Sequence, residues 1–68
     1  MKLVFQNVAG KKKTIANVDS EEQARAEISK FCADKNYEIT NIRRWENKGV
    51  VRYDVGSWIE AFLLYLNE

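Results

Sequence analysis

The side chains that could do chemistry in this 68-residue chain include ten carboxylates, three tyrosines and one cysteine, but no histidine. Because histidine is the base of the Ser-His-Asp and Cys-His arrangements, both are excluded. The carboxylates show neither the paired spacing of acid–base catalysis nor a cluster typical of a metal site. We therefore expect a protein that is not an enzyme and that uses no metal and no cofactor.

Two individual residues deserve a structural interpretation rather than a catalytic one. Asp54 lies just before Gly56 and Ser57, and short acidic side chains commonly accept backbone N–H bonds at such turns. Cys32 is the only cysteine, so it can form no internal disulfide, and no base is available to activate it. We expect Cys32 to be a small buried hydrophobic residue.

Basic and aromatic side chains interleave between positions 43 and 53, where Glu46 is the only acid before position 54. Guanidinium groups neutralise phosphates and bases stack on exposed rings, so this segment is a candidate nucleic-acid-binding site. The candidate residues are Arg43, Arg44, Trp45, Lys48 and Arg52. In the alternative interpretation the arginines pair with Glu38, Glu46 or Asp54 and Trp45 packs in the core. The net charge of +1 favours that alternative, because nucleic-acid-binding modules are usually distinctly basic.

The segment 58–66 is a candidate protein interface, because eight of its nine residues are hydrophobic. One helix stripe would not obviously cover so much apolar surface, and an exposed remainder would mark an interaction site. Tryptophan and tyrosine are also enriched at interface hot spots. The candidate interface residues are Trp58, Phe62 and Tyr65. In the alternative interpretation the whole segment is core.

The elements that must position these residues begin with a hairpin and a helix. Residues 2–8 and 13–18 have strand composition and flank a loop with Gly10, which is typical of a hairpin. Lysines 11–13 would keep this turn and its edge solvated. Residues 19–35 predict an amphipathic helix, capped by Asp19 or Ser20. Its apolar stripe comprises Ala24, Ile28, Phe31 and Cys32.

A second hairpin is predicted over residues 37–55, with the turn at residues 46–49. If the helix covers one face of the sheet, Arg43 and Trp45 share one face of their strand, and Arg44, Glu46 and Ile42 share the other. The segment 58–66 suits a strand buried on both sides, or a buried helix of fewer than three turns. Periodicity alone leaves both possibilities open.

The second half of the chain resembles a known group of sequences. Arg44-Trp45, a turn, the string from Val51 to Trp58 and then Phe62-Leu63-Leu64 are similar to a pattern in small uncharacterised phage and prophage proteins. Val55 stands where that pattern favours an aromatic residue. The resemblance covers residues 43–66 and implies no catalytic or binding residues. It implies a phage-type accessory protein, and it favours the last segment as the third strand of a meander.

Together these observations predict a single α+β domain over residues 1–68, with a mainly antiparallel sheet of four or five strands and one helix on one face. The N-terminal segment reaches Gln6 and Asn7 too soon for a signal peptide, and the longest apolar run is far short of the ~20 residues that span a bilayer. We therefore expect a cytoplasmic protein without a membrane partner. The predicted function is protein binding or self-association as a homodimer, and the alternative is nucleic-acid binding.

Overall fold

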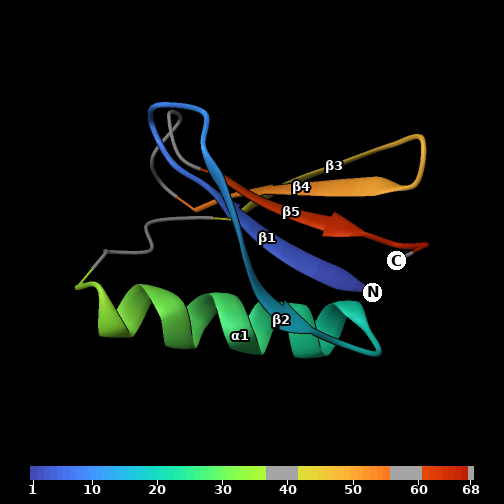
Figure 1. The fold of residues 1–68 in the computed structure, drawn as a ribbon. Coiled ribbons are helices and arrows are strands. Elements are labelled where there is room, and N and C mark those ends of the chain that lie inside the picture. Colours follow the sequence, from blue (N-terminus) through green and yellow to red (C-terminus); the bar gives the residue numbers. More distant parts are fainter. Residues whose placement is uncertain (37–41, 56–60, 68) are drawn as a thin grey trace.

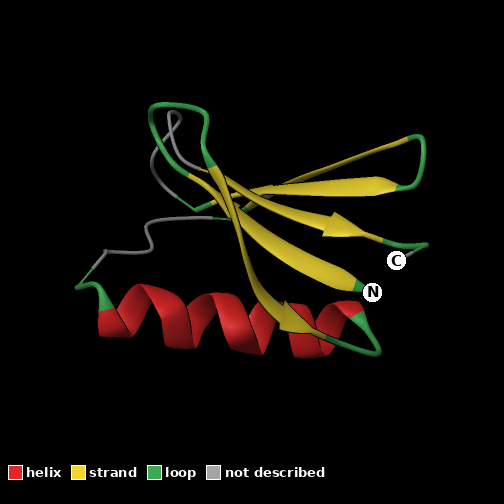
Figure 2. Ribbon diagram, in the orientation of Figure 1, coloured by secondary structure: helices red, strands yellow, loops and turns green. Residues whose placement is uncertain are grey.

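Five strands form one antiparallel sheet, and a single helix covers one of its faces, in a computed structural model that describes residues 1–36, 42–55 and 61–67 (Figures 1 and 2). The strands lie in the order β2-β1-β5-β4-β3. This arrangement confirms the predicted α+β class. The elements are β1 Lys2–Gln6, β2 Lys12–Asn17, α1 Glu21–Asp34, β3 Arg43–Asn47, β4 Val50–Asp54 and β5 Ala61–Tyr65.

The first strand ends at Gln6, earlier than the predicted position 8, because Asn7 begins the loop. The Asn7 Oδ1 atom accepts hydrogen bonds from the backbone N–H groups of Ala9 and Lys11, both at 3.0 Å. Asparagine commonly ends a strand in this way, by binding the backbone that follows it. Val8 therefore lies in the loop and is 63% exposed, and β1 ends at Gln6.

The helix begins where the capping pattern predicts. Ser20 is the N-cap and its Oγ accepts from the Gln23 N–H at 3.2 Å, while the Gln23 side chain accepts from the Asp19 N–H at 2.7 Å. Ala24, Ile28 and Cys32 are buried on one side of α1, which confirms the predicted stripe. Within the described residues, no helix combines the length and the hydropathy needed to cross a membrane.

A two-residue turn joins β3 to β4. Lys48 and Gly49 have φ angles of 51° and 79°, and two consecutive positive φ angles are the mark of a type I′ hairpin turn. Asn47 pairs with Val50 directly beside it, and Arg43 pairs with Asp54 at the far end. The predicted strand residues 37–41 lie outside the described part of the chain.

The last segment forms a strand at the centre of the sheet. β5 lies between β1 and β4 and pairs antiparallel with both, so β3, β4 and β5 form the predicted meander. Four of its five residues are buried, which explains why its sequence lacks a polar alternation. The strand alternative is therefore correct for Ala61–Tyr65, and residues 56–60 lie outside the described residues.

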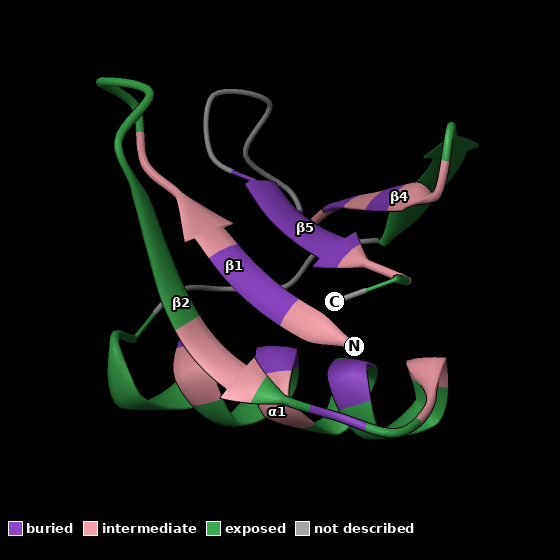
Figure 3. Ribbon diagram, turned by 45° about the vertical axis from the view of Figure 1, so that its right-hand side comes forward, coloured by how far each residue is buried: buried purple, intermediate pink, exposed green. Residues whose placement is uncertain are grey.

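The core lies between α1 and the sheet (Figure 3). Phe5, Phe31 and Phe62 pack their rings together with centroids 4.7 to 5.5 Å apart. These rings come from β1, α1 and β5, so aromatic packing joins the helix to two central strands. Val4, Ala61 and Leu63 are also buried but do not belong to this cluster, because they alternate with residues that face the helix.

Candidate protein interface at the β3 edge

The outer strands β2 and β3 differ in how well they are protected. All five residues of β3 are exposed, and Trp45 keeps 48% of its surface accessible. By contrast, β2 carries Lys12 and Lys13, and its pairing with β1 shifts register between Leu3 and Val4. Bulges and charged side chains, lysines above all, are devices that prevent edge strands from pairing with other chains. β3 is charged as well, but it carries both signs, in Arg43, Arg44 and Glu46, whereas the two charges of β2 are both positive. The pairing of β3 with β4 shows no register shift in the described strands.

The backbone of Arg44 and Glu46 faces outward from the β3 edge. The Leu66 N–H donates to the Gly49 carbonyl at 2.9 Å, which places the backbone groups of Gly49 toward β5. Because these groups alternate along an antiparallel strand, those of Val50 and Arg52 point toward β3. The backbone N–H and C=O groups of their partners, Asn47 and Trp45, therefore point toward β4. The N–H and C=O groups of Arg44 and Glu46 are left directed away from the sheet.

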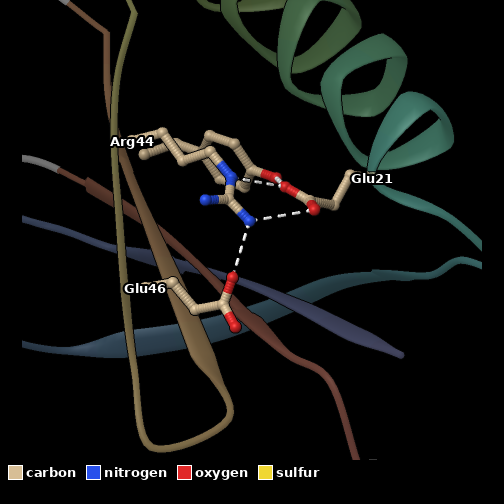
Figure 4. Close-up of polar contacts among 4 residues, drawn as sticks. Glu21, Arg44 and Glu46 are labelled. Carbon is tan, nitrogen blue, oxygen red and sulfur yellow. Dashed lines mark hydrogen bonds and ion pairs between the residues drawn. The ribbon is translucent and has the colours of Figure 1, made fainter.

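A polar cluster holds β3 and β4 against the start of the helix (Figure 4). Glu21, in the first turn of α1, accepts from Arg44 Nε at 2.7 Å and from Arg44 Nη2 at 3.0 Å. Its Oε1 atom also accepts from the Tyr53 hydroxyl at 2.6 Å. Arg44 Nη2 donates further to Glu46 Oε1 at 2.8 Å. The bidentate pair fixes the side-chain geometry of Arg44 on the helix side of the edge strand.

The cluster shifts the pKa of each of its central groups. The hydrogen bond from Arg44 and then that from Tyr53 lower the pKa of Glu21 to about 2. Burial, followed by the hydrogen bond to Glu21, raises the pKa of Tyr53 to about 12. Glu21 and Glu46 hold the pKa of Arg44 above its usual range. The carboxylate of Glu21 is therefore ionised, and the Tyr53 hydroxyl is a neutral donor, at neutral pH.

A different set of side chains lies on the sheet face opposite α1. The register places Val4, Leu63, Arg52 and Trp45 in one transverse row across β1, β5, β4 and β3. Trp45 ends this row at the exposed edge. The Arg52 guanidinium donates to Asp54 at 3.2 Å, so Asp54 pairs with an arginine along its own strand.

The structure divides the five candidate nucleic-acid-binding residues between two faces and a turn. Arg43, Trp45 and Arg52 share the face opposite the helix, whereas Arg44 lies on the helix face and Lys48 lies in the turn. This confirms the predicted separation of Arg43 and Trp45 from Arg44 and Glu46. The predicted pairings of the arginines with Glu46 and Asp54 are also present. The other part of that alternative, in which Trp45 packs in the core, is wrong, because Trp45 lies at the sheet edge on the face opposite α1 and is 48% exposed.

The three candidate interface residues of the last segment have separate outcomes. Phe62 is 1% exposed and packs against Phe5 and Phe31, so its assignment to a surface interface is wrong. The reason is the central position of β5, whose helix-facing side chains lie under α1. Tyr65 is half-buried on the other face, where its hydroxyl accepts a hydrogen bond from Lys12 Nζ at 3.4 Å. Trp58 lies outside the described residues.

Glu21 is the residue of the candidate site that the sequence did not indicate. It lies in the first helical turn, where an acidic side chain indicates only a favourable interaction with the helix dipole. Its partners Arg44 and Tyr53 are 23 and 32 positions away, and no local pattern indicates such a contact. The sequence does show another part of the candidate site, because Arg44 and Glu46 carry opposite charges and lie on either side of Trp45.

Neither a metal site nor a relative defines the function. Across residues 1–36, 42–55 and 61–67, no three histidine, cysteine or carboxylate side chains gather closely enough to hold a metal ion. Comparisons of the chain with protein-family models, with curated proteins and with solved structures found no match.

Proposed function

We propose that this chain is a small non-enzymatic interaction module that binds a protein partner through the β3 edge. The observation that supports this function is the exposure of an entire, regular edge strand that carries Trp45 at its centre. An extended partner strand would form hydrogen bonds with the outward N–H and C=O groups, and the tryptophan ring would supply apolar contact. A phage-type accessory role, suggested by the sequence resemblance, is compatible with this function and stays a prediction.

Site-specific photo-crosslinking tests the proposal in cells that express the chain. A photoreactive amino acid replaces Asn47 on β3, and in a matched control it replaces Lys13 on the other edge strand; both positions are exposed. We expect a defined crosslinked protein product from position 47 and none from position 13. The absence of a product from position 47, or equal products from both positions, would contradict a function at this edge.

A second candidate function is nucleic-acid binding on the sheet face opposite the helix. Arg43 and Arg52 flank Trp45 there, and Lys2 and Tyr65 lie on the same face by register. These side chains combine phosphate-neutralising groups with rings on which bases stack. Asp54 offsets part of that charge through its pair with Arg52, and for this reason we rank the function second.

A mobility-shift titration at low and high salt separates the two functions. If the sheet face binds single-stranded DNA or RNA, Arg43→Ala weakens binding and reduces its salt dependence. Lys30→Ala is the matched control, because it removes one positive charge from the exposed side of α1. No shift at low salt with either nucleic acid would eliminate this second function.

A further inference from the structure

We infer that the partner of the β3 edge is a second copy of this chain, paired antiparallel about a two-fold axis at Trp45. This inference rests on the proposed function, because it names the occupant of the same edge. It follows from the order of side chains along β3 and from the direction of its backbone groups.

The charges of β3 are complementary to themselves in one register. When two copies of the strand run antiparallel with Trp45 opposite Trp45, each Arg44 lies opposite Glu46 of the other copy. Such opposite-charge pairs stabilise neighbouring strands, whereas like charges at these positions would repel. At the next positions outward, Arg43 lies opposite Asn47, so the register brings no two like charges face to face within the strand.

The backbone geometry fits the same register. Directly opposed residues of antiparallel strands alternate between hydrogen-bonded and non-hydrogen-bonded pairs. The outward groups of Arg44 and Glu46 make the two Arg44–Glu46 pairs hydrogen-bonded, and each pair exchanges two N–H···O bonds. The central Trp45 pair is then non-hydrogen-bonded, which is the type that brings side chains closest. An axis placed on Arg44 or Glu46 would instead oppose identical charges.

The side chains of the polar cluster leave atoms for these new contacts. Arg44 donates through Nε and Nη2, and Glu46 accepts at Oε1. Within the part of the chain that is described, Arg44 Nη1 and Glu46 Oε2 make no hydrogen bond. The bidentate bond to Glu21 holds the guanidinium in place before association, which lowers the entropy lost on pairing.

The expected dimer is weak, because the contact is one short strand on each side. Stable complexes bury at least about 1,200 Å² in total, and a five-residue edge lies below that size. The dimer should therefore form at concentrations in the range of roughly 10 µM to 1 mM and dissociate on dilution. Its product would be one continuous ten-stranded sheet with both helices on the same face.

Sedimentation velocity across that concentration range tests the inference. We expect the average mass of the wild-type chain to rise toward twice 7.9 kDa. Glu46→Pro removes an outward N–H and should leave a monomer while retaining the fold by circular dichroism. The matched control is Lys12→Pro on the other edge, where the Asn7 to Lys11 bond makes position 12 outward-facing. This control should dimerise like the wild type.

A charge exchange tests the register itself. Glu46→Arg sets two arginines opposite each other and should abolish dimerisation. Arg44→Glu, combined with Glu21→Gln so that the new carboxylate faces no charge on the helix, should do the same. An equimolar mixture of these two chains should restore a dimer, because every opposed pair is then of opposite charge.

The inference is overturned if the wild-type chain stays monomeric up to about 1 mM, or if Glu46→Pro and Glu46→Arg dimerise as well as the wild type. A monomeric chain that still crosslinks to a different protein from position 47 overturns self-association and leaves the proposed function standing. A monomer without any crosslink overturns both.

Discussion

At the scale of single residues, Glu21 connects the helix to the exposed edge strand β3 and to its neighbour β4. Its Oε1 atom accepts hydrogen bonds from both Arg44 Nε and the Tyr53 hydroxyl. The Glu21 and Arg44 side chains are 38% and 35% exposed, so solvent weakens the ion pair. The Tyr53 side chain is buried by contrast. Its hydrogen bond to Glu21 is therefore less weakened by solvent than the ion pair and contributes more to stability.

Tyr53→Phe should lower the free energy of unfolding by about 1.5–3 kcal/mol, because it removes one hydrogen bond to a charged carboxylate and keeps the ring. Urea titration measures the change. Tyr65→Phe is the matched control, since that hydroxyl makes only a long contact of 3.4 Å with Lys12. Equal losses in the two variants would contradict a special role for the Glu21–Tyr53 bond.

The lowered pKa of Glu21 predicts a pH dependence of stability. A carboxyl whose pKa falls from 4.5 to about 2 on folding stabilises the protein above the higher value and loses that contribution as the pH falls through the lower one. The difference in unfolding midpoint between wild type and Glu21→Gln should therefore be constant above about pH 5 and shrink toward pH 2. A difference that does not change with pH would show that Glu21 is not held as the ion.

At the scale of secondary-structure elements, the β3–β4 turn contains a correctable strain. Lys48 has φ 51°, a left-handed conformation that costs a residue with a long side chain about 1 kcal/mol and that asparagine tolerates better. Lys48→Asn should raise the thermal unfolding midpoint by a few degrees for a domain of this size. Gly49→Ala is the contrasting variant.

Gly49→Ala should be destabilising for two reasons. Its φ is +79°, and a Cβ would lie 3.2 Å from the Asn67 side-chain nitrogen. Calorimetry of both variants checks the pair of expectations. A stabilised alanine variant would show that the turn is not held in the type I′ conformation.

Local patterns predicted the elements that depend on local contacts. The Ser20 cap, the stripe from Ala24 to Cys32 and the glycine turns were all readable, because their signals span only a few residues. The nature of the last segment was not readable, since a strand buried on both faces shows no alternation. The position of Phe62 in the core depends on β5 lying between β1 and β4, which is a long-range fact.

The candidate site was predictable in part for the same reason. Alternation along a strand separated Arg43 and Trp45 from Arg44 and Glu46. Which strand lies at the edge depends on strand order, and composition does not encode that order. The pairing of Arg44 with Glu21 bridges 23 positions, so it too required the folded chain.

At the scale of the whole molecule, β5 is the strand that unites two hairpins. The β1–β2 hairpin and the β3–β4 hairpin lie on opposite sides of it and are not hydrogen-bonded neighbours in the described sheet. Leu64, fully buried on β5, pairs with Leu3 on one side and Val51 on the other. Stability of the sheet therefore depends on this strand more than on any other.

Leu64→Ala should cost about 2–5 kcal/mol, because it opens a cavity where both hairpins meet the helix. In a chain of this length such a loss removes a large share of the total stability. Denaturant unfolding measures it, with Val50→Ala on the partly exposed face of β4 as control. A loss below about 1 kcal/mol would contradict the central role of β5.

The place of β5 in the chain also sets the order in which the protein can fold. Each hairpin is closed by its own short turn and can form early, but an isolated hairpin is marginal in water. The strand that joins them is the last described element to be synthesised. Neither hairpin can gain its central neighbour, and the aromatic cluster cannot close around Phe62, until residues 61–65 have left the ribosome. Folding of the sheet is therefore expected to follow synthesis of that segment rather than accompany it, as one late cooperative step.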